Sequence, residues 1–289
     1  MSEVLTSGMV GIPLDGPVPR PPQYGLPSVA LEVTPNPTDR GGAVITPYPD
    51  GMIGEGEDIS GPVTSHDPCS DGSARLKDFP NALTIPAGFP SWTAYLGEVC
   101  TAYNIGPWED WKARANVALA AREAWALEAQ LAGAIFAAAP NLNDSPDVLG
   151  GAAVSPASAV AYLEGAIADT GIEGVLHLTK EVVAYLGVSF FTNAGGILRT
   201  AAGTPVVAGT GYKAAGAPSG QAAAAAGQSW VYATGPVLYA RSATIYNAPD
   251  TIAEALDRED NTVIYRAERD LWVGWDEQLK AAVLADWTP

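Results

Sequence analysis

The sequence predicts an α+β fold, and three features support this prediction. One long uninterrupted helix is expected over residues 107–139, short helices and strands alternate between residues 151 and 250, and an alternating strand pattern occupies residues 263–275. Before the helix the chain is rich in proline, which fixes φ and removes a backbone donor. Residues 1–100 are therefore expected to run as extended segments and loops.

The long helix is the element around which the remainder is expected to be organised. Alanine, leucine, glutamate, arginine and glutamine dominate it, and these residues lose little entropy in a helix. Pro107 suits the first helical position, and Pro140 is expected to end the helix, which would be about 45 Å long. Trp108, Trp111 and Trp125 fall at helical spacing, so we interpret them as packing residues of a spine helix.

The segments before the helix are expected to reach outward. Residues 1–40 should form an extended N-terminal arm whose regular apolar residues lie on its own domain or on a neighbouring subunit. Strand candidates at residues 41–46 and 91–100 enclose a stretch rich in glycine, aspartate, glutamate and serine. Residues 41–106 could thus form a projecting two-stranded loop, and a loop packed back on its own domain is the alternative.

The segment after the helix mixes short helices and strands. A second helix is expected from Ser155 to about Ala168, a buried strand over residues 174–178, and a short helix from Thr179 to Leu186. Strand, turn and strand follow between residues 197 and 211. Residues 214–228 read as a flexible loop of low complexity. Residues 230–241 are expected to form one strand that bulges at Gly235 and Pro236.

The last segment has the clearest period in the chain. Apolar residues alternate from Val263 to Trp275, with Arg269 breaking the pattern, so this stretch predicts a long half-buried strand or bent hairpin. A further strand is expected over residues 279–284.

Charge excludes some functions. The net charge is −17 with 15 basic residues, and these form no cluster of the kind that grips nucleic acid. No apolar run approaches the ~20 residues of a membrane span, and no secretion signal is visible, so a soluble protein made in the cytoplasm is expected. His177 lies in an apolar strand and is expected to be a hydrogen-bonded core residue.

The two cysteines leave two readings open. Cys69 and Cys100 could pair and close a loop of about 30 residues, or both could remain free thiols, the default in a reducing compartment. A particle that leaves the cell would favour pairing.

No catalytic motif is present. The sequence contains no Gly-x-Ser-x-Gly elbow, no phosphate-binding loop and no dinucleotide fingerprint, so no enzymatic activity, cofactor or metal is predicted. The rival of a different class is a hydrolase or sugar-binding domain that uses its tryptophans and tyrosines as a ligand face. The helical spacing of three tryptophans favours packing over that reading.

The order of these pieces, with three stretches of sequence, resembles the tailed-phage major capsid proteins of the HK97-like fold. Residues 174–179 resemble the strand that enters the family's axial domain. Residues 196–209, with Gly203-Thr204-Pro205-Val206-Val207, resemble a strand that recurs there. Residues 261–269 and 281–283 resemble the family's closing strands. The resemblance covers most of the chain after residue 100, whereas residues 1–100 agree only in style.

The resemblance implies a division of the chain and a function. It implies an arm (1–40), a projecting loop (41–106), a spine helix of the peripheral domain (107–150), an axial domain (151–250) and closing strands (251–289). It further implies a structural subunit that self-assembles into pentamers and hexamers of an icosahedral phage head in the host cytoplasm. The head would enclose double-stranded DNA without sequence-specific binding, with scaffolding, portal and decoration proteins as further partners of the virion.

Two departures and two alternatives accompany this expectation. No scaffolding segment precedes the arm, and Lys77 is the only lysine of the loop region, so the covalent cross-link of some family members is not predicted. An accessory or head–tail virion protein is one alternative function. An encapsulin-like nanocompartment shell is the other.

Overall fold

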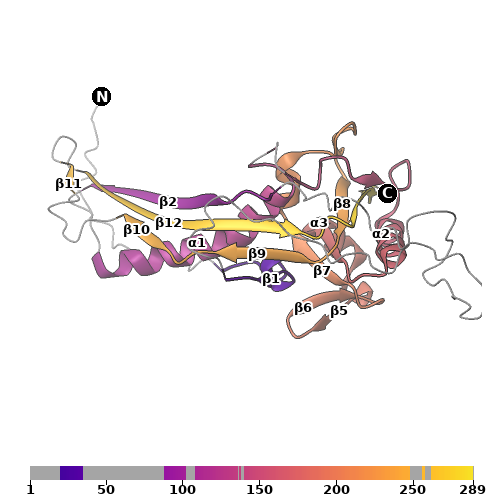
Figure 1. Cartoon of the computed structure of the whole chain (residues 1–289), viewed down its shortest axis with the longest axis horizontal. Helices are drawn as coiled ribbons and strands as arrows, with labels where there is room; N and C mark the ends of the chain where they lie inside the picture. The colour runs from indigo at the N-terminus through magenta and orange to yellow at the C-terminus, as the bar shows by residue number, and fades with distance from the viewer. Residues whose placement is uncertain are drawn as a thin grey trace, which may run out of the picture.

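The computed structural model describes residues 20–34, 88–101, 108–135, 137, 140–247, 256–257 and 262–288. The molecule is elongated, with a six-stranded sheet at one end and a seven-stranded sheet at the other (Figure 1). Helix α1 (Trp108–Leu131) runs along the six-stranded sheet and reaches the seven-stranded one. We call these the long sheet and the short sheet.

The long sheet is built on strand β12 (Thr262–Trp275). One edge of β12 pairs with β2 (Trp92–Thr101), and the other edge pairs first with β9 and then with β10, all antiparallel. The remaining strands of this sheet are β1 (Leu31–Glu32), β9 (Val237–Arg241), β10 (Ile245–Asn247) and β11 (Leu256–Asp257). Because Leu271 lies opposite both Trp92 and Arg241, these three side chains share the face toward α1.

The short sheet is covered on both faces. Its strand order is β3 (Asp147–Val148), β13 (Lys280–Asp286), β8 (Gln228–Thr234), β4 (Val175–Thr179), β7 (Pro205–Gly209), β6 (Ile197–Thr200) and β5 (Phe191–Ala194). Helices α2 (Pro156–Thr170) and α3 (Lys180–Leu186) cover one face, where Leu163 packs against Leu176 and neighbouring strand residues. The end of α1 covers the other face, with Leu127 and Leu131 in the second core.

Three short 3-10 helices complete the described structure. They are η1 (Leu26–Ser28), η2 (Val188–Phe190) and η3 (Gly211–Ala215). Helices η1 and η3 both contact α1. None of the helices in the described ranges is long and apolar enough to cross a membrane.

One two-stranded ribbon passes through both sheets. Strands β8 and β13 pair in the short sheet, and their continuations β9 and β12 pair in the long sheet. The prediction of a single strand over residues 230–241 is therefore wrong, because the chain changes sheets at Gly235 and Pro236. Pro236 has no N–H for a ladder, and a Cβ on Gly235 would lie 2.8 Å from the Asp276 carbonyl oxygen, so the two crossings meet closely here.

Most predicted elements are confirmed, but the long helix is shorter than expected. The second helix, the short helix and the strands at residues 174–178, 197–211 and 263–275 occur as predicted. Helix α1 ends at Leu131 instead of residue 139, because Gly133 adopts a φ of 91° and turns the chain over Asn141. The strand candidate at residues 41–46 lies outside the described residues.

His177 is a fully buried core residue, as predicted. Its Nδ1 lies 2.8 Å from the Tyr212 hydroxyl, and its Nε2 lies 2.9 Å from Thr234 Oγ1. Thr234 Oγ1 donates to the Gly235 carbonyl, so it accepts from His177 Nε2–H, and Nδ1 accepts from Tyr212. Burial lowers the pKa of His177 to about 3 and keeps the ring neutral.

A glycine pair tests the close approach of η3 to α1. Gly211→Ala would place a Cβ 2.5 Å from the Trp125 carbonyl oxygen, so we expect a loss of about 1–3 kcal/mol in urea unfolding. Gly165→Ala, on an open stretch of α2, is the control and should gain about 0.5–1 kcal/mol. Equal effects of the two substitutions would contradict the described packing.

The buried His177, which is hydrogen-bonded to Tyr212 and Thr234, predicts a specific pH dependence of the stability. The folded pKa of about 3 lies below the usual 6.5, so the unfolded chain binds an extra proton as the pH falls between these values. This residue should therefore cost roughly 1.4 kcal/mol of stability per pH unit in that window. His177→Gln keeps an acceptor and a donor without titrating. The free energy of unfolding is measured in urea at pH 7 and at pH 5. Between these pH values it should fall less for the variant than for the parent.

Candidate functional site

Two buried glutamates on α1 form the most densely connected polar site of the described structure. Glu123 and Glu128 are 5% and 1% exposed, and each binds elements that are far away in sequence. We call this site the α1 junction. A buried carboxylate is costly unless it is paired or fully hydrogen-bonded, so its partners show which elements the fold must keep together.

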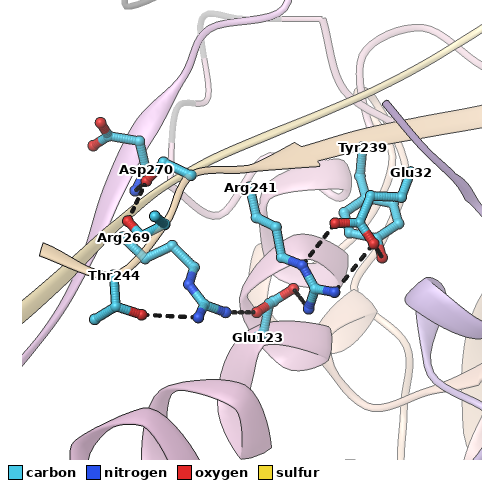
Figure 2. A network of polar contacts seen from close by, with 9 residues as sticks. Glu32, Glu123, Tyr239, Arg241, Thr244, Arg269 and Asp270 are labelled. Carbon is cyan, nitrogen blue, oxygen red and sulfur yellow. Dashed lines mark hydrogen bonds and ion pairs between the residues drawn. The ribbon is translucent and has the colours of Figure 1, made fainter. Parts of the chain in front are cut away.

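Glu123 is neutralised by two arginines from the long sheet. Its Oε2 lies 2.7 Å from Arg269 Nη1, and its Oε1 lies 3.1 Å from Arg241 Nη1 (Figure 2). Arg269 also donates to Thr244 Oγ1 at 2.8 Å. The residue that broke the apolar pattern of β12 is thus the partner of the buried carboxylate.

Arg241 extends this network to the N-terminal segment. It donates from Nε and Nη2 to the two oxygens of Glu32, at 2.8 and 3.1 Å (Figure 2). Burial alone would raise the pKa of Glu32, but hydrogen bonds from Arg241 and Tyr239 and the charges of Arg241 and Arg269 lower it below its usual value. Burial and the neighbouring Glu32 raise the pKa of Tyr239 to about 12, so its hydroxyl remains a donor to that carboxylate.

Glu128 binds backbone amides. Its Oε2 accepts the N–H groups of Thr210 and Gly211 at 2.9 and 3.0 Å, and its Oε1 accepts that of Leu26 at 3.2 Å. A Cβ on Gly209 or Gly211 would lie 2.5–2.6 Å from Glu128, so both positions require glycine. Burial raises the pKa of Glu128, and these N–H groups with the charge of Lys180 offset only part of that rise.

The junction therefore ties residues 20–34 to the remainder of the chain. Tyr24 accepts the Ala208 N–H of β7, Leu26 donates to Glu128, and Glu32 binds Arg241. The chemistry of this arrangement is structural, because the carboxylate oxygens of Glu32, Glu123 and Glu128 all bind groups of the same chain. Within the described ranges no group of three His, Cys, Asp or Glu side chains could hold a metal ion.

The predicted site residues lie away from the junction or outside the description. Cys69 is not among the described residues, and Cys100 lies in β2 opposite Val263, so the disulfide stays a prediction. Trp108 and Trp111 lie in α1, where their side chains are not described. Trp125 is 49% exposed and thus does not join the core of this chain. The buried side of α1 carries Ala124, Leu127 and Leu131 instead.

The sequence contained one signal of the junction, namely the charge at Arg269 on the apolar side of β12. The partners could not be named, because Glu123 and Glu128 look like ordinary polar residues of an alanine-rich helix. Glu32 and Arg241 lie 209 residues apart, and only the parallel pairing of β1 with β9 brings them together.

A glutamate pair tests the role of Glu128. Glu128→Gln places an NH₂ group beside backbone N–H groups, which cannot accept a hydrogen bond from it. We therefore expect the free energy of unfolding in urea to fall by about 2–4 kcal/mol. Glu164→Gln is the control, because Glu164 binds the hydroxyls of Thr200 and Thr204, which can turn and accept. It should lose less than about 1 kcal/mol. Similar losses would show that the amides do not depend on the carboxylate.

No protein-family model matches the sequence, and no curated protein matches it either. Solved structures do. The structure is similar to a chain from the capsid of an empty GTA particle, with a TM-score of 0.50, 14% identity and coverage of 98% of this chain and 94% of the other. A native GTA particle capsid gives a TM-score of 0.49 at 13% identity, with coverage of 100% and 99%. An encapsulin complex from Synechococcus elongatus PCC 7942 gives 0.41 at 11% identity, with coverage of 69% and 74%. The chain therefore has the HK97-like fold of tailed-phage major capsid proteins.

Proposed function

We propose that this chain is a shell subunit that self-assembles into pentamers and hexamers of an icosahedral phage-type head enclosing double-stranded DNA. The observation that carries the proposal is the likeness to a capsid chain over 98% of the sequence. The α1 junction supports it, because the site serves to hold an extended chain together and offers no reactive group. The protein would be a component of the virion, assembled in the host cytoplasm.

The outer face of the long sheet supports assembly. Leu31, Tyr95 and Ile245 are 64%, 73% and 50% exposed. Strand register places all three on the face away from α1, since Tyr95 and Ile245 both lie opposite Glu268. Large apolar side chains gathered on one sheet face are typical of a surface that another protein covers. Neighbouring copies of the chain would provide that cover, and heterologous contacts that close would produce rings.

We further propose the division of the chain that the resemblance implied. Residues 1–40 would be the arm, 41–106 the projecting loop, 107–150 the spine helix, 151–250 the axial domain and 251–289 the closing strands. We would move the end of the axial domain from residue 250 to the end of β8, since β9 belongs to the long sheet. Scaffolding, portal and decoration proteins would be the further partners.

Self-assembly of the purified full-length chain is the direct test. Multi-angle light scattering and negative-stain electron microscopy should show rings of five or six subunits or closed shells. Tyr95→Lys should reduce assembly while leaving the thermal unfolding of the subunit unchanged, because Tyr95 is exposed in the single chain.

The same particles separate the alternatives. Shells that carry nuclease-protected DNA after co-expression with phage packaging proteins would support the head subunit. Shells that carry a protein cargo instead would identify an encapsulin-like compartment. A dozen copies in a virion would identify an accessory or head–tail protein. A monomer at all concentrations, with or without scaffolding protein, would contradict the proposal.

A further inference from the structure

The ribbon that crosses between the sheets has an interrupted ladder in its middle. Between the last pair of the short sheet, Thr234 with Lys280, and the first of the long sheet, Val237 with Trp275, one strand has two residues and the other has four. Two backbone hydrogen bonds span this gap, from Asp276 N–H to the Pro236 oxygen at 3.0 Å and from Gly235 N–H to the Leu279 oxygen at 3.4 Å. The ladder is thus interrupted where the two sheets meet.

Residues 20–34, which we call the strap, bridge the same two sheets through non-covalent contacts. At one end the Tyr24 carbonyl accepts the Ala208 N–H of the short sheet at 2.8 Å, and Asn193 donates to the Tyr24 hydroxyl at 3.0 Å. At the other end Val33 N–H donates to the Tyr239 oxygen of the long sheet at 2.8 Å, and Glu32 binds Arg241. Figure 1 shows β1 of the strap beside β9, near the place where the two sheets meet.

The strap packs against both cores, but only one of its large side chains is fully buried. Leu26 is that side chain, whereas Tyr24, Val29, Ala30 and Val33 are partly buried against the cores. A cavity of about 290 Å³ lies between the strap and α1, lined by Pro21, Pro22 and other strap residues, by Ala120 and Ala124, and by β9. Elements with few buried apolar contacts open at a lower free energy than the whole fold.

We propose that the strap is a latch that fixes the angle between the two sheets, and that its release lets the ribbon bend at the Gly235–Pro236 crossing. The strap is bound to both sheets by hydrogen bonds and one ion pair, and its middle is anchored by Leu26 and by the Glu128 carboxylate. Its detachment would remove β1 from the edge of the long sheet and break the contacts to the short sheet, while the pairings among the other strands of both sheets stay intact. This device is a property of the single chain and does not depend on the proposed assembly.

The test follows the strap and the sheet angle separately, on unassembled full-length chains. Hydrogen exchange of residues 24–34 reports the strap. Double electron–electron resonance reports the sheets, with spin labels on Tyr95→Cys and Thr192→Cys in a Cys69→Ser/Cys100→Ser background; both label sites are exposed. The release variant is Leu26→Ala/Glu32→Gln. Glu173→Gln is the control, because its 3.8 Å contact with Arg199 lies away from the strap.

In the release variant we expect strap exchange to be roughly tenfold faster or more, the factor for loss of one charge-assisted hydrogen bond, and the label distance distribution to broaden. The control should match the parent in both readings. Fast strap exchange with an unchanged distance distribution would overturn the proposal. Glu32→Gln alone keeps Leu26 buried and decides the matter if the double variant fails to fold. Unchanged strap exchange in that single variant would also contradict the latch.

Discussion

The ion pairs of Glu123 with Arg269 and Arg241 are the constraint on which the arrangement of the long sheet depends. A carboxylate with 4% of its side chain exposed cannot remain charged there without partners, and the partners come from two different strands. A shift of β12 by one residue would turn Arg269 to the outer face and leave Glu123 with Arg241 of β9 as its one described ion-pair partner. The network therefore selects one register of the sheet against the helix, whatever its net contribution to stability.

Glu128, the second buried carboxylate of α1, is stabilised by backbone hydrogen bonds instead of by ion pairs. Glu128 is surrounded by backbone N–H groups that need an acceptor, and no arginine is within ion-pair distance among the described side chains. This arrangement excludes side chains at positions 209 and 211, because there is no room for a Cβ on Gly209 or Gly211. One helix thus holds the long sheet through charges and the short sheet through amides. The N-terminal segment contacts both sites, which explains why a proline-rich stretch with little structure of its own has a defined path.

Local patterns predicted much of this fold, and contacts between distant residues could not be predicted. The 3.6 and 2.0 periods identified α2 and β12, because each buries one face of its own. Strand β4 was recognised as an apolar run, which is buried on both faces, and α3 from the residues at its two ends. The crossing at Gly235 and Pro236 was missed, because a strand that changes sheets keeps its local pattern. Trp125 was interpreted as a packing residue because it falls at helical spacing with Trp108 and Trp111, whereas the buried side of α1 faces the strap and η3. Arg269 marked the candidate site, but its partner depended on the packing of α1 against the sheet.

The coupling between Glu123 and Arg269 tests this account most directly. A double-mutant cycle would combine Glu123→Gln and Arg269→Met and measure the free energy of unfolding of the parent, both single variants and the double variant. Arg269→Met removes one of the two arginines that bind Glu123, and Glu123→Gln removes the charge that both arginines bind, so we expect a coupling free energy of about 2–3 kcal/mol. Additive losses would contradict the account, because they would show that the register of the long sheet on α1 does not depend on this pair.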